Sequence, residues 1–250
     1  MTTDTSTHVT THHPVRTDLR TDLRTDLGTD ATAAAPTDRG SRSWALAGIG
    51  AGLAGIATIV TTSMVDAVYD PAIEGNTRAI TEKLSEQTTP MLAFHSIAVV
   101  GALLMVVFAA GLHRRLRGMT DSIVPMVAFA GLAGTAVVSV LGSGLDTEFA
   151  IGLLRGHAEA DPNALMYNHW IGTIPWVWVL AGLSGLALFA AARQRVVPRW
   201  IGRVGLVLGG LTVLAGVSPF EYVAGATGSL WLVVTAIGLT VGDRAFRAGR

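Results

Sequence analysis

From Trp44 onward the sequence alternates between long apolar runs and short polar segments. Crossing the hydrocarbon core of a bilayer takes about 20 helical residues. Lipid offers the backbone no outside hydrogen-bond partner, so apolar runs of this length form helices. The pattern therefore predicts an all-α, polytopic membrane bundle of six transmembrane helices. The predicted spans lie near residues 44–65, 91–112, 123–145, 170–192, 201–218 and 229–242.

The composition agrees with a membrane protein whose main partner is the lipid bilayer. Only 14% of the residues are charged and 50% are hydrophobic, whereas soluble domains carry about 25% charged residues. The formal net charge is zero, which indicates no nucleic-acid partner. The chain has no cysteine, so disulfides and thiolate chemistry are excluded. Lys83 is the single lysine among 18 basic residues, a bias that suggests a GC-rich bacterial genome.

Residues 1–43 differ from the rest of the chain, being rich in Thr, Asp and Arg and containing the repeat "RTDLRTDLRTDLGTD". On a helix this repeat would place like charges four residues apart, where they repel. Such a composition is typical of a disordered segment, and we expect a disordered cytoplasmic tail. The alternative is a short helix that docks on a partner or on lipid headgroups.

Arginine is distributed unevenly among the loops. In a six-span topology one side carries every basic residue except Arg78, Lys83 and Arg155. Because basic residues collect on the cytoplasmic side, we expect both termini to be cytoplasmic, in a multi-pass protein of the bacterial plasma membrane. Two outer loops are long. Residues 70–90 contain a predicted surface helix over 74–87 that Asn76 or Thr77 caps, and residues 146–170 contain "FAIGLL", expected along the membrane interface.

Many of the 29 glycines lie inside the predicted spans. Gly48 with Gly52 and Gly205 with Gly209 have the spacing that lets two helix backbones approach closely in lipid. Ala130 with Gly134, and Ala181 with Gly185, extend the pattern to two more spans. We favour packing inside one bundle, and keep a homo-oligomer or a membrane partner on the glycine-rich faces as the alternative.

Ionisable residues collect at the predicted extracytoplasmic ends of the spans and form a candidate polar site. The candidate residues are Asp66, His95, Asp146, Glu148, His169 and Glu221. Counting about 20 residues from the inner arginines places His95 just inside the hydrocarbon and His169 about 6 Å outside it. His169, in "YNHW", therefore resembles an interfacial anchor. His95 needs a polar partner from the third, fourth or fifth span.

Three functions remain open from the sequence. The first is binding or transport of a small molecule or cation, with His95 as the titrating group. The second is a membrane-embedded enzyme in which His95 and His169 bind a metal with Asp146 and Glu148, or ligate a haem. The third is an accessory membrane protein without chemistry of its own. No local ligand motif such as HExxH occurs, so the sequence identifies neither a cofactor nor a catalytic residue.

The C-terminal third resembles small six-helix bacterial integral membrane proteins that form families of unknown function. The likeness rests on "VPRWIGRVGLVLGGLTVLAGV" (197–217), in which a Pro-Arg-Trp turn enters a glycine-rich helix. It also rests on "LWLVVTAIGLTVG" (230–242), in which Leu-Trp opens the final helix. The resemblance implies a six-helix fold and supplies no activity or site residues.

Overall fold

A computed structural model describes residues 43–118, 122–156 and 161–242. The predicted tail, residues 1–43, lies outside the described residues except for Ser43. Throughout the described ranges the secondary structure is helical, so the expected all-α class is confirmed.

Five helical segments are long and apolar enough to cross a membrane. They are Ser43–Thr62, Thr88–Arg117, Val124–Leu154, Asn163–Arg193 and Tyr222–Val241. Large apolar side chains on their outer surfaces are exposed, among them Leu103 at 62% and Val137 at 66%. An apolar surface this extensive needs a nonpolar surrounding, which the bilayer supplies. The chain is therefore a helical membrane protein.

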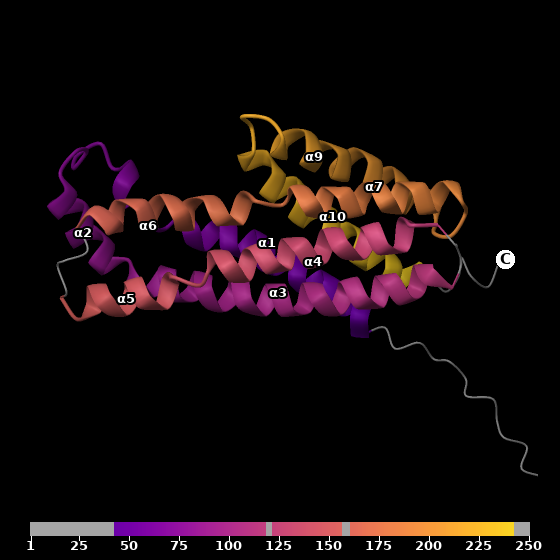
Figure 1. The fold of residues 1–250 in the computed structure, drawn as a ribbon, viewed down its shortest axis with the longest axis horizontal. Helices are drawn as coiled ribbons and strands as arrows, with labels where there is room; N and C mark the ends of the chain where they lie inside the picture. The colour runs from indigo at the N-terminus through magenta and orange to yellow at the C-terminus, as the bar shows by residue number, and fades with distance from the viewer. Residues whose placement is uncertain (1–42, 119–121, 157–160, 243–250) are drawn as a thin grey trace, which may run out of the picture. The chain divides into compact units, whose positions relative to one another are not determined.

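Helices that follow one another in the sequence pack side by side in the bundle (Figure 1). Helix α1 (Ser43–Thr62) packs between α10 (Tyr222–Val241) and α3 (Thr88–Arg117). Next come α4 (Val124–Gly142) and α7 (Val179–Arg193). Residues 199–216 contact both α7 and α10 and close the ring.

The fifth predicted span, near 201–218, is not one regular helix. It consists of α8 (Arg199–Val204), the π-helical segment η4 (Gly205–Gly209) and α9 (Gly210–Gly216). A Cβ added to Gly185 of α7 would lie 2.9 Å from the Cα of Gly209, so η4 packs backbone against backbone on α7. The wider π turn coincides with this contact. As a result five spans are identified rather than the six expected.

The fourth predicted span, 170–192, is also interrupted. Helix α6 (Asp161–Thr173) is followed by the 3-10 turn η3 (Ile174–Trp176), and α7 begins only at Val179. Pro175 lies in η3, and a proline inside an α-helix removes one hydrogen bond and clashes with the preceding turn. The expected span near 170–192 lies within the apolar segment Asn163–Arg193, which is long enough to cross a membrane and is broken at η3. Helix α5 (Asp146–Leu154), which contains "FAIGLL", continues the direction of α4 (Figure 1) instead of crossing it.

The predicted surface helix is confirmed as α2 (Thr77–Glu86). The side chain of Asn76 accepts a hydrogen bond of 3.1 Å from the Ala79 amide, so Asn76 is the N-cap. One face of α2 is apolar, and Ile80 and Leu84 on that face are buried.

Helices α2, α5 and α6, the 3-10 turn η1 (Ala67–Tyr69) and the first turns of α3 form a separate group at one end of the bundle (Figure 1). We call this group the cap. It has its own apolar core, made of Val65, Ala67, Ile80, Leu84, Met91, Phe94, Ala98, Ala150, Leu153, Ala164, Tyr167 and Ile171. The sequence pattern predicts helices at several of these residues, including Ile80 and Leu84 in the surface helix, but it does not predict α6, which carries Ala164 and Tyr167.

Cap and spans meet where several helices end or break. The Thr62 hydroxyl, at the end of α1, donates a 2.8 Å hydrogen bond to the Ile171 carbonyl near the end of α6. The Trp170 indole donates a 2.7 Å bond to the carbonyl of Gly142, the last residue of α4. Helix α3 alone among the described helices passes this level without interruption.

Glycines of the predicted packing pairs face other helices of the same chain. Gly48 faces Phe108 of α3 and Gly52 faces Val233 of α10. Gly134 faces Leu180 of α7. These contacts support packing within one bundle.

Candidate functional site

Asp146, the first residue of α5, has no exposed surface although it is a carboxylic acid. Its Oδ1 accepts a 3.0 Å hydrogen bond from the Tyr167 hydroxyl. Its Oδ2 has no hydrogen-bond partner. Burying a carboxylate oxygen without a donor or a counter-charge is unfavourable, so the surroundings of Oδ2 determine what this group can do.

The group next to Oδ2 is the imidazole of His95, whose Nδ1 lies 3.6 Å away. The same Nδ1 lies 3.0 Å from the Ser143 carbonyl oxygen. A carbonyl oxygen only accepts, so Nδ1 carries a proton and points toward both oxygens. The contact agrees with the expectation that His95 finds a polar partner at the end of the third span. The side chain of His95 is 30% exposed.

Tyr167 fixes the position of the carboxylate. It is 1% exposed, and its ring stacks on Phe149 with centroids 4.4 Å apart and planes 9° apart. Phe149 lies on α5, the helix that begins at Asp146, and Tyr167 lies on α6, so the stack joins these two helices. His95, Asp146 and Tyr167 thus form one polar cluster, which we call the His95 cluster, where the cap meets the spans.

Asp66 lies in a different, exposed cluster on the cap. Its Oδ1 accepts a 2.7 Å hydrogen bond from the Gln87 amide, and Lys83 Nζ lies 3.1 Å from the same oxygen. Lys83 also donates a 2.9 Å bond to Asp70. The hydrogen bond from Gln87, followed by that from Lys83, lowers the pKa of Asp66, and Lys83 lowers the pKa of Asp70. This cluster fastens the segment after α1 to α2 and does not reach the His95 cluster.

The remaining predicted site residues do not converge. His169 is exposed, and its Nδ1 lies 3.4 Å from the Tyr69 hydroxyl. Glu148 and Glu221 are exposed. The predicted polar site is therefore divided, and only His95 and Asp146 of its six residues meet.

The hypothesis of a metal or haem centre gains little from this geometry. In the described ranges, no three His, Asp or Glu side chains lie close enough together to hold a metal ion. Of the proposed ligands His95, His169, Asp146 and Glu148, the first and third form the only pair for which a contact is observed.

Two important polar residues were not among the predicted site residues. Asn168 is completely buried. Its Oδ1 accepts a 3.0 Å bond from the Val68 amide and its Nδ2 donates a 2.9 Å bond to the Val65 carbonyl. Tyr167, beside it, holds Asp146. In the stretch "YNHW" His169 was the predicted site residue, whereas on α6 it is Tyr167 and Asn168 that are buried.

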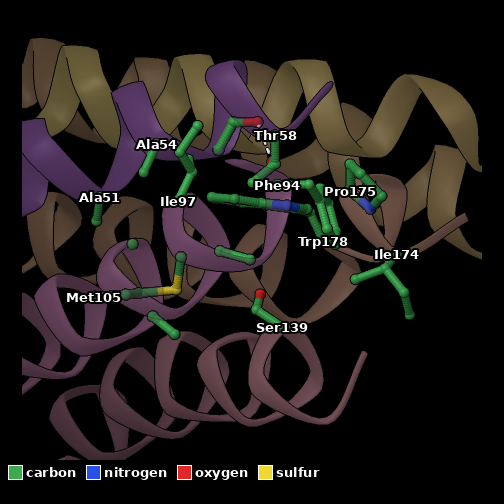
Figure 2. A pocket seen from close by; sticks show the side chains of 14 residues that line it. Ala51, Ala54, Thr58, Phe94, Ile97, Met105, Ser139, Ile174, Pro175 and Trp178 are labelled. Atoms are coloured by element: carbon green, nitrogen blue, oxygen red, sulfur yellow. Dashed lines mark hydrogen bonds between the residues drawn. The ribbon is translucent and has the colours of Figure 1, made fainter. Parts of the chain in front are cut away.

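Below the His95 cluster, a small cavity lies between α1, α3, α4 and η3 (Figure 2). Phe94, Met105, Ile174 and Trp178 line much of it, and the volume open to a water-sized molecule is about 20 Å³. The hydroxyl of Thr58, also in its wall, donates to the Gly55 carbonyl of its own helix. A site of this size holds about one water molecule and no substrate.

The His95 cluster is thus the place in the described ranges where the buried carboxyl of Asp146 and the buried hydroxyl of Tyr167 meet the part-exposed imidazole of His95. Comparison of the chain with known protein families, with curated proteins and with solved structures gave no match.

Proposed function

We propose that the chain is a proton-responsive membrane protein in which His95 and Asp146 couple proton binding to the packing of the cap on the spans. The observation that carries this proposal is the buried Oδ2 of Asp146, which has no hydrogen bond and lies 3.6 Å from the His95 imidazole. The proposal develops the binding function expected from the sequence, with a proton as the ligand.

His95 takes up the proton at its second ring nitrogen. Nδ1 already carries hydrogen toward Ser143, so uptake at Nε2 turns the ring into a cation facing Asp146. The imidazolium then supplies the counter-charge that the buried carboxylate lacks.

No other titratable group described near His95 and Asp146 takes the place of either side chain in their contact. Tyr167, on α6, donates to the other carboxylate oxygen. Glu148, on α5, is exposed, and His169 contacts Tyr69 instead. A charge on His95 therefore acts mainly on Asp146, and through Asp146 on the contact between α3, α5 and α6.

A pH series of thermal unfolding in lipid nanodiscs tests the proposal. We expect the melting temperature of the wild type to depend on pH over a tested range of about pH 5 to 8, because proton binding changes the charge that faces the buried carboxylate. Asp146→Asn should remove this dependence, whereas His95→Gln should alter it, because the buried Asp146 carboxyl remains titratable without its partner. His169→Gln, which changes an exposed histidine of the same cap, is the matched control and should keep it.

A wild-type melting temperature that does not change over this range would contradict the proposal. So would a dependence that survives His95→Gln but disappears in His169→Gln. Hydrogen exchange of α5 and α6 at one fixed pH separates a local change in the cap from general unfolding.

We further propose that residues 199–216 form a sixth span, so that both termini lie on the cytoplasmic side of a bacterial plasma membrane. Support comes from their place in the ring between α7 and α10 and from the unequal distribution of arginine. A reporter active only in the cytoplasm should be active after Arg250 and inactive near Glu82. Activity at one terminus only would favour five spans, and activity at Glu82 would contradict the orientation.

A further inference from the structure

We propose that the turn between α7 and α8 binds the phosphate of an anionic phospholipid headgroup. This site lies at the opposite end of the bundle from the cap and is independent of the His95 cluster. The turn borders a hollow of about 290 Å³ lined by Phe189, Ala192, Arg193, Arg195, Arg199 and Arg203.

Four guanidinium groups surround this hollow, and among the residues that the structure describes none supplies a negative charge to balance them. All four arginines are exposed, and no carboxylate of a described residue lies within ion-pair distance of them. The described carboxylates belong to the cap or to the turn that precedes α10. Like charges placed together repel, so the arrangement favours an anion among them. Guanidinium groups bind phosphate oxygens through paired N–H donors.

The backbone at Arg195 supplies an independent argument. Its φ is +60°, and within the described ranges it is the only residue other than glycine with a positive φ. The Val196 amide donates to the Ala191 carbonyl at 2.9 Å, and the Arg195 amide donates to the Ala192 carbonyl at 3.0 Å. These two bonds define a Schellman motif, in which Arg195 occupies the left-handed position that glycine usually takes.

An arginine in this conformation is less favourable than glycine, because its Cβ crowds the backbone there. The chain has 29 glycines and uses them freely elsewhere, yet it places arginine here. Strain of this kind is retained where the side chain has a task. The task that fits is a fourth guanidinium at the hollow.

The turn is also rigid. Val196 and Val197 are 1% and 0% exposed, and the Arg115 guanidinium of α3 donates a 3.2 Å bond to the Val196 carbonyl. The arginines therefore extend from a fixed backbone, which lowers the entropic loss on binding.

Trp200 indicates the level of the turn relative to the bilayer. It is 44% exposed, and its ring lies against Gly238 of α10, where a Cβ would clash with it. Half-exposed tryptophans at the ends of spans lie at the headgroup level. Basic pockets between transmembrane helices at this level bind phosphate-bearing lipid headgroups, so a lipid is the source of the phosphate.

The experiment measures how many phosphatidylglycerol molecules the purified protein retains from mixed phosphatidylcholine and phosphatidylglycerol nanodiscs, by native mass spectrometry. Arg195→Gly should lower the affinity by about tenfold, because it removes one charge-assisted contact. The same variant should raise the melting temperature by about 2–4 °C, because it relieves the left-handed strain. Weaker binding in a more stable protein cannot result from misfolding.

Arg117→Gln is the matched control, since Arg117 is an exposed arginine at the end of α3 and does not line the hollow. It should leave retention unchanged. Equal losses in Arg117→Gln and Arg195→Gly would show a diffuse surface effect and overturn the site, as would unchanged retention in Arg195→Gly. Displacement of the lipid by inorganic phosphate at millimolar concentration would assign the site to free phosphate and overturn the lipid proposal.

Discussion

Replacing Asn168 by alanine should loosen the cap without unfolding the spans. Asn168 is completely buried and joins α6 to the segment after α1 through two hydrogen bonds, 3.0 Å from the Val68 amide and 2.9 Å to the Val65 carbonyl. The substitution leaves the buried Val65 C=O and the part-buried Val68 N–H without these partners. A fully buried unpaired group is destabilising by about 1–3 kcal/mol and a part-buried one by about 1 kcal/mol, so we expect a loss of about 2–4 kcal/mol in the free energy of opening the cap.

Native-state hydrogen exchange with mass spectrometry measures that free energy segment by segment. Amides of α6 and η1 should exchange about 30-fold to 900-fold faster in Asn168→Ala, whereas those in the middle of α3 should keep their protection. Asn163→Ala is the matched control, because Asn163 is an exposed asparagine of the same helix. Equal exchange in the two variants would refute the reasoning that these two bonds hold the cap together.

Two further results are expected. The lowered pKa values of Asp66 and Asp70 imply that their contacts with Lys83 stabilise the cap above about pH 4 and are lost as pH falls through the lowered values. Proteolysis of α2 should therefore become faster at acidic pH, and Lys83→Met should be cleaved at neutral pH as fast as the wild type is at acidic pH. Gly185→Ala should destabilise the bundle by about 1–3 kcal/mol in thermal unfolding, because its Cβ would meet the Gly209 backbone at 2.9 Å; in the control Gly210→Ala the nearest atom is 3.8 Å away, and a loss as large there would contradict the packing argument.

Apolar length predicted the spans well where one helix crosses the bundle alone. Helices α1, α3, α4 and α10 each overlap an expected span, because about 20 apolar residues have no stable alternative to a helix in lipid. The interruptions could not be read in the same way. The π-helical η4 packs against glycines of α7, which come earlier in the chain. The pattern of residues within 201–218 alone does not show which segment will pack against it.

The candidate site was predictable in part. Depth counting identified His95 as a residue that needs a polar partner, and the structure places it beside Ser143 and Asp146. The burial of Tyr167 and Asn168 follows from the register of α6, a helix that the sequence analysis treated as loop up to residue 170. Without that helix, the sequence offers no reason to expect that Tyr167 and Asn168 are buried while His169 is exposed.

The uninterrupted course of α3 has a mechanical consequence. Its 30 residues extend about 45 Å, and it is the only described helix that continues from the spans into the cap without a break. The neighbouring connections, at Ser143 and at Ile174–Trp178, are short non-α-helical joints. A continuous α-helix resists bending more than a joint that lacks its regular hydrogen bonds. Helix α3 is therefore the stiff connection between the cap and the spans, and the two joints are the compliant ones.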